Sequence, residues 1–238
     1  MHTKKEPWLL VGLALALLII WQLPGGDYFI YPFTILSTWF HEMGHGLMAW
    51  ALGGTFLRLE IFQNGSGLAT YSLPVTASKF THGLIALAGP IGPAVAGALF
   101  ILASPHPKTS RILLWLLGVS LLLSSLIWVR SIYGLLAIPL IGSILLWVGC
   151  RCSEKVAHFC VNLAGVQAAM SLYQHVDYFF TESVTIAGKT MLSDTGQMEQ
   201  AFWFPHWFWA LTIILFSITT LCLSIWFAYR NAGQANTS

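Results

Sequence analysis

The segment Ser37–Trp50, "STWFHEMGHGLMAW", places two histidines and a glutamate in a run that is otherwise mostly apolar or small. On an α-helix, residues four apart lie on one face, so His41 and His45 would stack with Glu42 beside them. This is the H-E-x-x-H arrangement, in which two imidazoles bind zinc and the glutamate acts as general base. The segment therefore predicts a helix with His41 and His45 as metal ligands and Glu42 as the catalytic residue.

The composition is that of a membrane protein. Charged residues make up 8% of the 238-residue chain and hydrophobic residues 56%, whereas about a quarter of the residues in an average soluble protein are charged. Long stretches carry no charge if histidine is ignored: Pro7–Gly26, Phe80–Pro107, Ile112–Val129, Ser131–Cys150 and Gln200–Tyr229. About 20 apolar residues cross the hydrocarbon layer, so we expect the chain to lie in a lipid bilayer. The net charge of +2 is too small to suggest a nucleic-acid partner.

The uncharged stretches predict an all-α polytopic membrane protein, folded as a single integral membrane domain over residues 1–238 with a core at about 30–180. We expect about seven transmembrane helices, at roughly 8–23, 30–52, 80–103, 111–129, 131–149, 156–180 and 203–228. Only Arg130 and Ser131 separate the fourth from the fifth. These two helices would form a tight hairpin, or one of them would be re-entrant.

Two connections are long enough to contain further structure. In Gly53–Lys79, apolar residues alternate with others on both sides of "NGSG", which predicts a short β-hairpin after the second helix. Thr181–Ala201 is polar, and its "SDTGQ" indicates a turn or a helix cap at Ser193 or Asp194.

The predicted metal site would lie at membrane depth. A carboxylate such as Glu42 near the bilayer centre costs about 2.5–3.5 kcal/mol on insertion scales, so such residues usually mark functional sites. From His45 to Gly53 a rise of 1.5 Å per residue leaves about 12 Å to the helix end. The metal would thus be nearer one face. Lys4 and Lys5 beside the first helix favour a cytoplasmic N-terminus, which makes that face the cytoplasmic one.

Catalytic zinc sites usually have three protein ligands and an open position, so a third ligand is needed. The sequence has only three aspartates, of which Asp27 lies at the opposite end of the second helix and Asp194 in a polar loop. Asp177 comes near the end of the sixth helix, which runs parallel to the second if all seven helices cross the membrane. We therefore predict Asp177 as the third ligand. Three residues remain as alternatives: His175, His82 and Glu60.

These residues resemble those of the site-2 protease family of intramembrane zinc metalloproteases. "HEMGH" in a hydrophobic helix matches the zinc motif of that family, and "LAGPIGPAVAGAL" (Leu87–Leu99) looks like its glycine- and proline-rich segment. The expected hairpin occupies the place of its membrane-associated β-hairpin. The resemblance covers about residues 30–180 and implies zinc as cofactor, His41 and His45 as ligands, and Glu42 as catalytic acid and base.

The chain departs from the family pattern at the third ligand. Classical members carry it in Asn-Pro-Asp-Gly or Leu-Asp-Gly, and neither occurs here, since Asp177 lies between Val176 and Tyr178. The chain looks like a divergent, short bacterial branch without a PDZ domain, which implies the bacterial cell membrane as its location.

The resemblance implies a zinc metalloendopeptidase that cleaves transmembrane protein substrates. Two other classes fit the same residues: an inactive protein that binds zinc and partners, and a transporter that uses the histidines as a proton relay. The lack of an internal repeat argues against the transporter.

Overall fold

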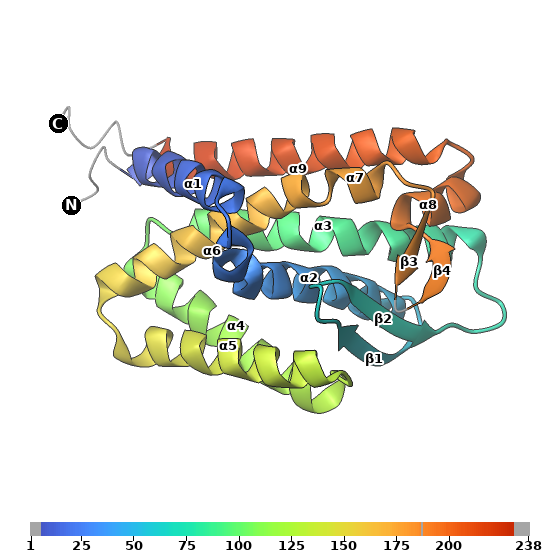
Figure 1. Cartoon of the computed structure of the whole chain (residues 1–238), viewed down its shortest axis with the longest axis horizontal. Coiled ribbons are helices and arrows are strands. Elements are labelled where there is room, and N and C mark those ends of the chain that lie inside the picture. Colours follow the sequence, from blue (N-terminus) through green and yellow to red (C-terminus); the bar gives the residue numbers. More distant parts are fainter. Residues whose placement is uncertain (1–5, 187, 231–238) are drawn as a thin grey trace.

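The structure is a computed structural model that describes residues 6–186 and 188–230 of the chain. Nine helices and two β-hairpins are found in these residues (Figure 1). The helices are α1 (Glu6–Gln22), α2 (Gly26–Ala51), α3 (Lys79–Ala103), α4 (Pro107–Ile127), α5 (Ile132–Arg151), α6 (Glu154–Gln174), α7 (Val176–Phe179), α8 (Asp194–Phe202) and α9 (His206–Tyr229). The strands are β1 (Thr55–Ile61), β2 (Gly67–Ser72), β3 (Ser183–Ile186) and β4 (Lys189–Leu192).

All seven expected helices are present, as α1 to α6 and α9. Within the described residues, four of them are long and apolar enough to cross a membrane, namely α3, α4, α5 and α9. The apolar part of α1 is shorter, and α2 and α6 carry more polar residues. The chain is therefore a helical membrane protein, and the crossing of the bilayer by all seven helices stays a prediction. The two hairpins mean that it is not purely α-helical.

Helix α3 is the centre of the assembly and lies between α2 and α9 (Figure 1). Glycines allow α2 and α3 to pack closely, because a Cβ at Gly44 would overlap the Ala88 carbonyl and one at Gly92 would overlap the Phe40 carbonyl. Small residues at a helix contact have this effect in membrane proteins generally. Close packing of α2 on α3 holds the histidine-bearing face of α2 against a fixed neighbour.

The predicted hairpin after α2 is confirmed as β1 and β2, which pair antiparallel. The outer edge of β1 is bound to the turn between α4 and α5, where the Leu59 amide donates to Trp128 O (2.8 Å) and the Arg130 amide donates to Leu59 O (2.9 Å). Ser131, the N-cap of α5, also accepts from the Ile61 amide (2.8 Å). The helices α4 and α5 form the tight hairpin that was one of the two expectations.

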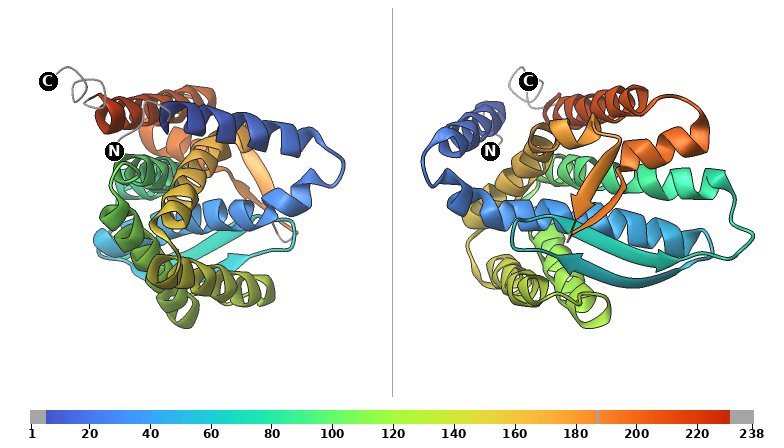
Figure 2. Two further views of the ribbon diagram at one scale, coloured as in Figure 1. Left: turned by 90° about the vertical axis from the view of Figure 1, so that its left-hand side faces the viewer. Right: turned by 45° about the vertical axis from the view of Figure 1, so that its right-hand side comes forward.

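The region after α6 differs most from the expectation. Helix α6 ends at Gln174, whereas the sequence pattern predicted a helix up to residue 180, and a second hairpin, β3–β4, precedes an additional helix, α8. Figure 2 shows this hairpin reaching from α7 and α8 towards β1–β2.

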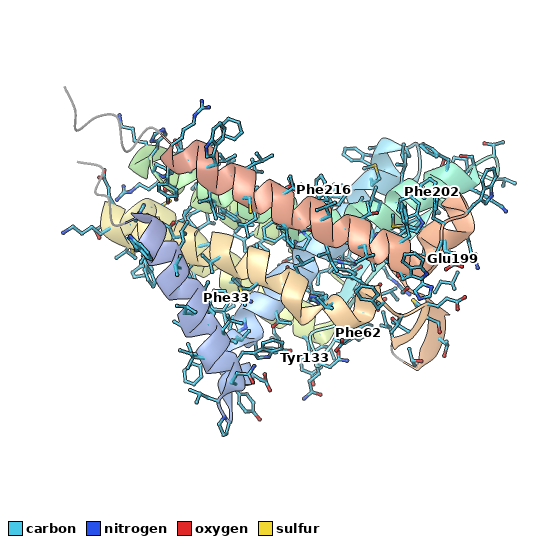
Figure 3. The ribbon with its side chains drawn as sticks, turned by 90° about the horizontal axis from the view of Figure 1, so that it is seen from above. Phe33, Phe62, Tyr133, Glu199, Phe202 and Phe216 are labelled. Carbon is cyan, nitrogen blue, oxygen red and sulfur yellow. The ribbon has the colours of Figure 1, made fainter. Side chains whose placement is uncertain are left out.

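Two aromatic contacts hold α8 in place. A Cβ at Gly83 of α3 would overlap the ring of Phe202, and that ring packs on Trp209 of α9 with centroids 5.1 Å apart. Figure 3 shows Phe202 and Glu199 on α8 beside the start of α9. The start of α8 is thereby directed towards α2.

Candidate metal centre

Two histidines on one face of α2 form the base of the site. His41 and His45 are one helical turn apart, and their Nε2 atoms lie 3.1 Å from each other. His45 Nδ1 donates a hydrogen bond to Ile85 O of α3 (2.8 Å). This bond fixes the tautomer, so Nε2 carries the lone pair that a metal needs. Gly89 makes room for the ring, because a Cβ there would overlap the His45 imidazole.

Asp194, at the start of α8, completes the cluster. Its Oδ2 lies 2.9 Å from His41 Nε2 and its Oδ1 lies 3.3 Å from His45 Nε2. The preceding residue, Ser193, caps α8 by accepting from the Gly196 amide (3.1 Å). Burial alone would raise the pKa of the Asp194 carboxyl, but the His45 and His41 imidazoles hold that pKa well below its usual range. The carboxylate is thus charged and buried among the two rings.

The donor set fits a zinc ion. The ligand atoms of His41, His45 and Asp194 all lie within 4.8 Å of one another. Zinc takes nitrogen and oxygen ligands at about 2.0–2.2 Å, so tetrahedral donors around one ion lie about 3.3–3.6 Å apart. The observed separations of 2.9–3.3 Å are at or a few tenths of an ångström below this spacing, so small side-chain shifts would seat an ion. Two imidazoles and one carboxylate also leave a fourth position, as catalytic zinc sites do.

Glu42 lies beside this cluster and is separate from the three donors. Its side chain is buried, with the residue 6% exposed, and its Oε2 accepts from the Ala69 amide of β2 at 2.6 Å. A Cβ at Gly67 would come within 3 Å of the Glu42 side chain, so the glycine gives that carboxylate its space. The helix α2 and the strand β2 together set the position of this carboxylate.

A family model described as Peptidase M50B-like matches residues 10–224, which is most of the chain. The chain belongs to the site-2 protease family. No curated protein and no solved structure matches it.

In this member of the site-2 protease family, the residue beside the histidines is Asp194 and not Asp177, which the sequence analysis favoured. Asp177 is exposed on the one-turn helix α7 and is absent from the cluster. The physical reason is that α6 ends early and the β3–β4 hairpin reverses the chain, which carries Asp194 back to α2. Asp194 and α9 also lie outside the core expected at about 30–180.

The alternatives for the third ligand are also outside the cluster. His82 is exposed, and Glu60 pairs with Arg58 (3.1 Å). His175 donates through Nδ1 to Ser171 O (2.7 Å). A signal near Asp194 was present in the sequence, since "SDTGQ" predicted a turn or a helix cap at Ser193 or Asp194, and the structure has the cap at Ser193. A cap alone does not indicate which residues the helix faces.

Tyr178 of α7 is a site residue that the sequence analysis missed. Its hydroxyl donates to Asp194 Oδ2 (3.0 Å) and accepts from the Asp194 amide (3.3 Å). Its ring meets the His41 ring edge-on, with centroids 6.3 Å apart. Tyr178 therefore orients the Asp194 carboxylate through the same oxygen that His41 contacts.

A groove runs past this protease-family site between β2 and the β3–β4 hairpin. It consists of two adjoining spaces of about 320 and 230 Å³. The two spaces share six lining residues: His41, Glu42, Gly67, Tyr178, Val184 and Ile186. The three donors and Glu42 therefore face this open groove, which has β2 along one side.

Proposed function

We propose that this chain is an intramembrane zinc metalloprotease that hydrolyses peptide bonds in or near transmembrane segments of membrane proteins. The observation that supports it best is the convergence of His41, His45 and Asp194 beside Glu42 at the wall of a groove. Membership of a metalloprotease family also supports this function. A proton relay in a transporter would have no need of three metal donors within 4.8 Å.

His41, His45 and Asp194 would hold the zinc ion. Zinc in such a site lowers the pKa of a coordinated water and polarises a peptide carbonyl. The hydrogen bonds from His45 Nδ1 to Ile85 O and from Tyr178 to Asp194 Oδ2 would keep two of the donors oriented. The protein thus supplies a preformed donor set within a groove.

Glu42 would act as general base and then as general acid. Its Oε2 would take a proton from the attacking water, and the same carboxyl would give a proton to the leaving amine. The Ala69 amide, 2.6 Å from Oε2, holds the carboxylate at the groove wall. A peptide seated in the groove would keep bulk water from competing for this proton transfer.

The substrate would bind as an extended segment along the outer edge of β2. The outer edge of β1 is occupied by the turn between α4 and α5. The outer edge of β2 lines the groove, and on it the Ala69 amide is already bound to Glu42. Strand addition supplies main-chain hydrogen bonds and needs an extended peptide. The substrate helix would therefore have to unwind where it enters the groove.

The test is metal analysis of the purified chain together with cleavage of transmembrane peptides in detergent or liposomes. The proposal predicts bound zinc at one equivalent per chain, cleavage that stops on chelation and returns with zinc, and cuts within or beside the apolar segment. Bound zinc without any cleavage across a panel of such peptides would favour an inactive zinc-binding protein instead.

A further inference from the structure

A small cavity lies among the helices next to His41. It is lined by residues of α2, α3, α6, α7 and α9 and has a volume of about 40 Å³. Of the described residues, His41 and His175 line both this cavity and the groove. The cavity is thus a separate space that adjoins the candidate metal centre through two imidazoles.

Two serine hydroxyls in the wall of this cavity have no hydrogen-bond partner among the described residues. They are Ser37 Oγ of α2 and Ser217 Oγ of α9, on residues 3% and 6% exposed. Buried hydroxyls without a partner are costly and therefore rare. They need a partner that residues 6–186 and 188–230 do not supply.

Buried serines elsewhere in α6 and α9 bond to their own backbone. Ser171 Oγ donates to Ala168 O (2.7 Å) and Ser224 Oγ donates to Leu221 O (2.7 Å). Ser224 lies two turns from Ser217 on the same helix. Ser171 lines the same cavity, so a helical serine there can bond to its own backbone, whereas Ser37 and Ser217 do not.

The wall contains a further acceptor, the imidazole of His175. His175 donates through Nδ1 to Ser171 O (2.7 Å), which leaves its Nε2 as an acceptor when the ring is neutral.

We propose that this cavity holds ordered water between Ser37 and Ser217, and that this water supplies the hydrolysis once substrate fills the groove. A buried water needs roughly 10–15 Å³ and two to four polar partners. A cavity of about 40 Å³ therefore has room for about three water molecules. The supply of water to hydrolysis rests on the proposed function, whereas the presence of water in the cavity does not.

The reaction itself explains why water held in the cavity would be needed. Each cleavage consumes one water: its oxygen forms the new C–O bond as the C–N bond breaks, and its protons end on the new amine and in the medium. A peptide seated along β2 would occupy the groove and cut the metal centre off from bulk solvent. Water held beside His41 and His175 would still be within reach.

Hydration is tested by X-ray radiolytic footprinting of the purified full-length chain, in which hydroxyl radicals formed from bound water oxidise adjacent side chains. The probe is Phe179, which lines the cavity and is 3% exposed, and the reference is Phe100, which is 4% exposed in the apolar core. Phe179 should be oxidised several-fold faster than Phe100. Equal rates would mean a dry cavity and would overturn the proposal.

The role of the two hydroxyls is tested with the double variant Ser37→Ala, Ser217→Ala and with Ser224→Ala as matched control. The double variant should lower Phe179 oxidation to the level of Phe100, and the control should leave it unchanged. Retained fast oxidation in the double variant would overturn the assignment of the hydroxyls. Zinc content and melting temperature are measured on each variant to establish that it is folded.

Supply is tested by single-turnover cleavage of a bound peptide. The double variant should lose the cleavage rate several-fold with unchanged peptide affinity and zinc content, and Ser224→Ala should lose nothing. A normal rate in the double variant with a dehydrated cavity would overturn the supply role. If the wild-type chain cleaves nothing, the proposed function and the supply role fail together, and the footprinting alone decides whether water is held.

Discussion

Asp194 Oδ2 lies 2.9 Å from His41 Nε2, although the two residues come from helices far apart in the sequence. The contact depends on α8 being packed between α3 and α9 and on the hairpin that precedes it. It makes Asp194 the expected third zinc ligand in place of Asp177.

Replacing Asp194 by alanine should weaken zinc binding strongly. The variant loses the only carboxylate among the three donors, and changes merely in the surroundings of a ligand already cost about 10–100-fold in affinity. Zinc affinity is measured by competition with a chromophoric chelator. Asp177→Ala is the matched control, because its exposed side chain lies outside the cluster. The assignment fails if zinc affinity drops in the Asp177 variant and persists in the Asp194 variant.

Tyr178→Phe should weaken zinc binding less than loss of Asp194, by about 10–100-fold. The variant keeps the ring against His41 but removes the hydroxyl that orients Asp194 Oδ2. Tyr31→Phe removes a hydroxyl that donates to Gln63 O (2.9 Å), away from the cluster, and should leave zinc affinity unchanged. Equal zinc affinities for the wild type, Tyr178→Phe and Tyr31→Phe would mean that Tyr178 has no positioning role.

Gly67→Ala should reduce cleavage while zinc stays bound. The added methyl group would come within 3 Å of the Thr38 and Glu42 side chains, so Glu42 would have to move. The three zinc donors are not in that contact. Gly12→Ala in α1, where a methyl group meets nothing within 4 Å, is the control. Cleavage at the wild-type rate in Gly67→Ala would show that the position of Glu42 matters little.

The orientation in the membrane remains a prediction. With a cytoplasmic N-terminus, a cysteine introduced in 64–66, in the turn between β1 and β2, should react with an impermeant thiol reagent only after cell lysis. The four native cysteines are first removed. Labelling in intact cells would reverse the orientation and with it the cytoplasmic side of the metal centre.

The sequence predicted the elements that local pattern determines. Long runs without charged residues marked five of the seven longer helices, and "NGSG" between alternating residues marked β1–β2. His41, Glu42 and His45 were predictable because one helical turn brings them together regardless of the rest of the fold. Ser193 was predictable as a cap from its local motif.

The third donor was beyond local pattern. The position of Asp194 depends on where α6 ends, on the short β3–β4 hairpin, and on the contact of Phe202 with Gly83. None of these has a periodic signal, since β3 and β4 have four residues each. Asp177 was favoured because its helix was expected to run parallel to the one that carries His41 and His45. A parallel direction places two residues near the same side of the membrane, but it does not show that they touch.

The most direct test of the central claim is the Glu42→Gln variant. The amide keeps the size of the side chain but cannot take the proton of the attacking water, and loss of a general base costs about 10²–10⁴-fold in rate. Zinc content by metal analysis and the cleavage rate of a transmembrane peptide are measured on the same preparation. The account predicts a full complement of zinc with cleavage reduced by that factor. Unchanged cleavage in a zinc-loaded Glu42→Gln protein would contradict it.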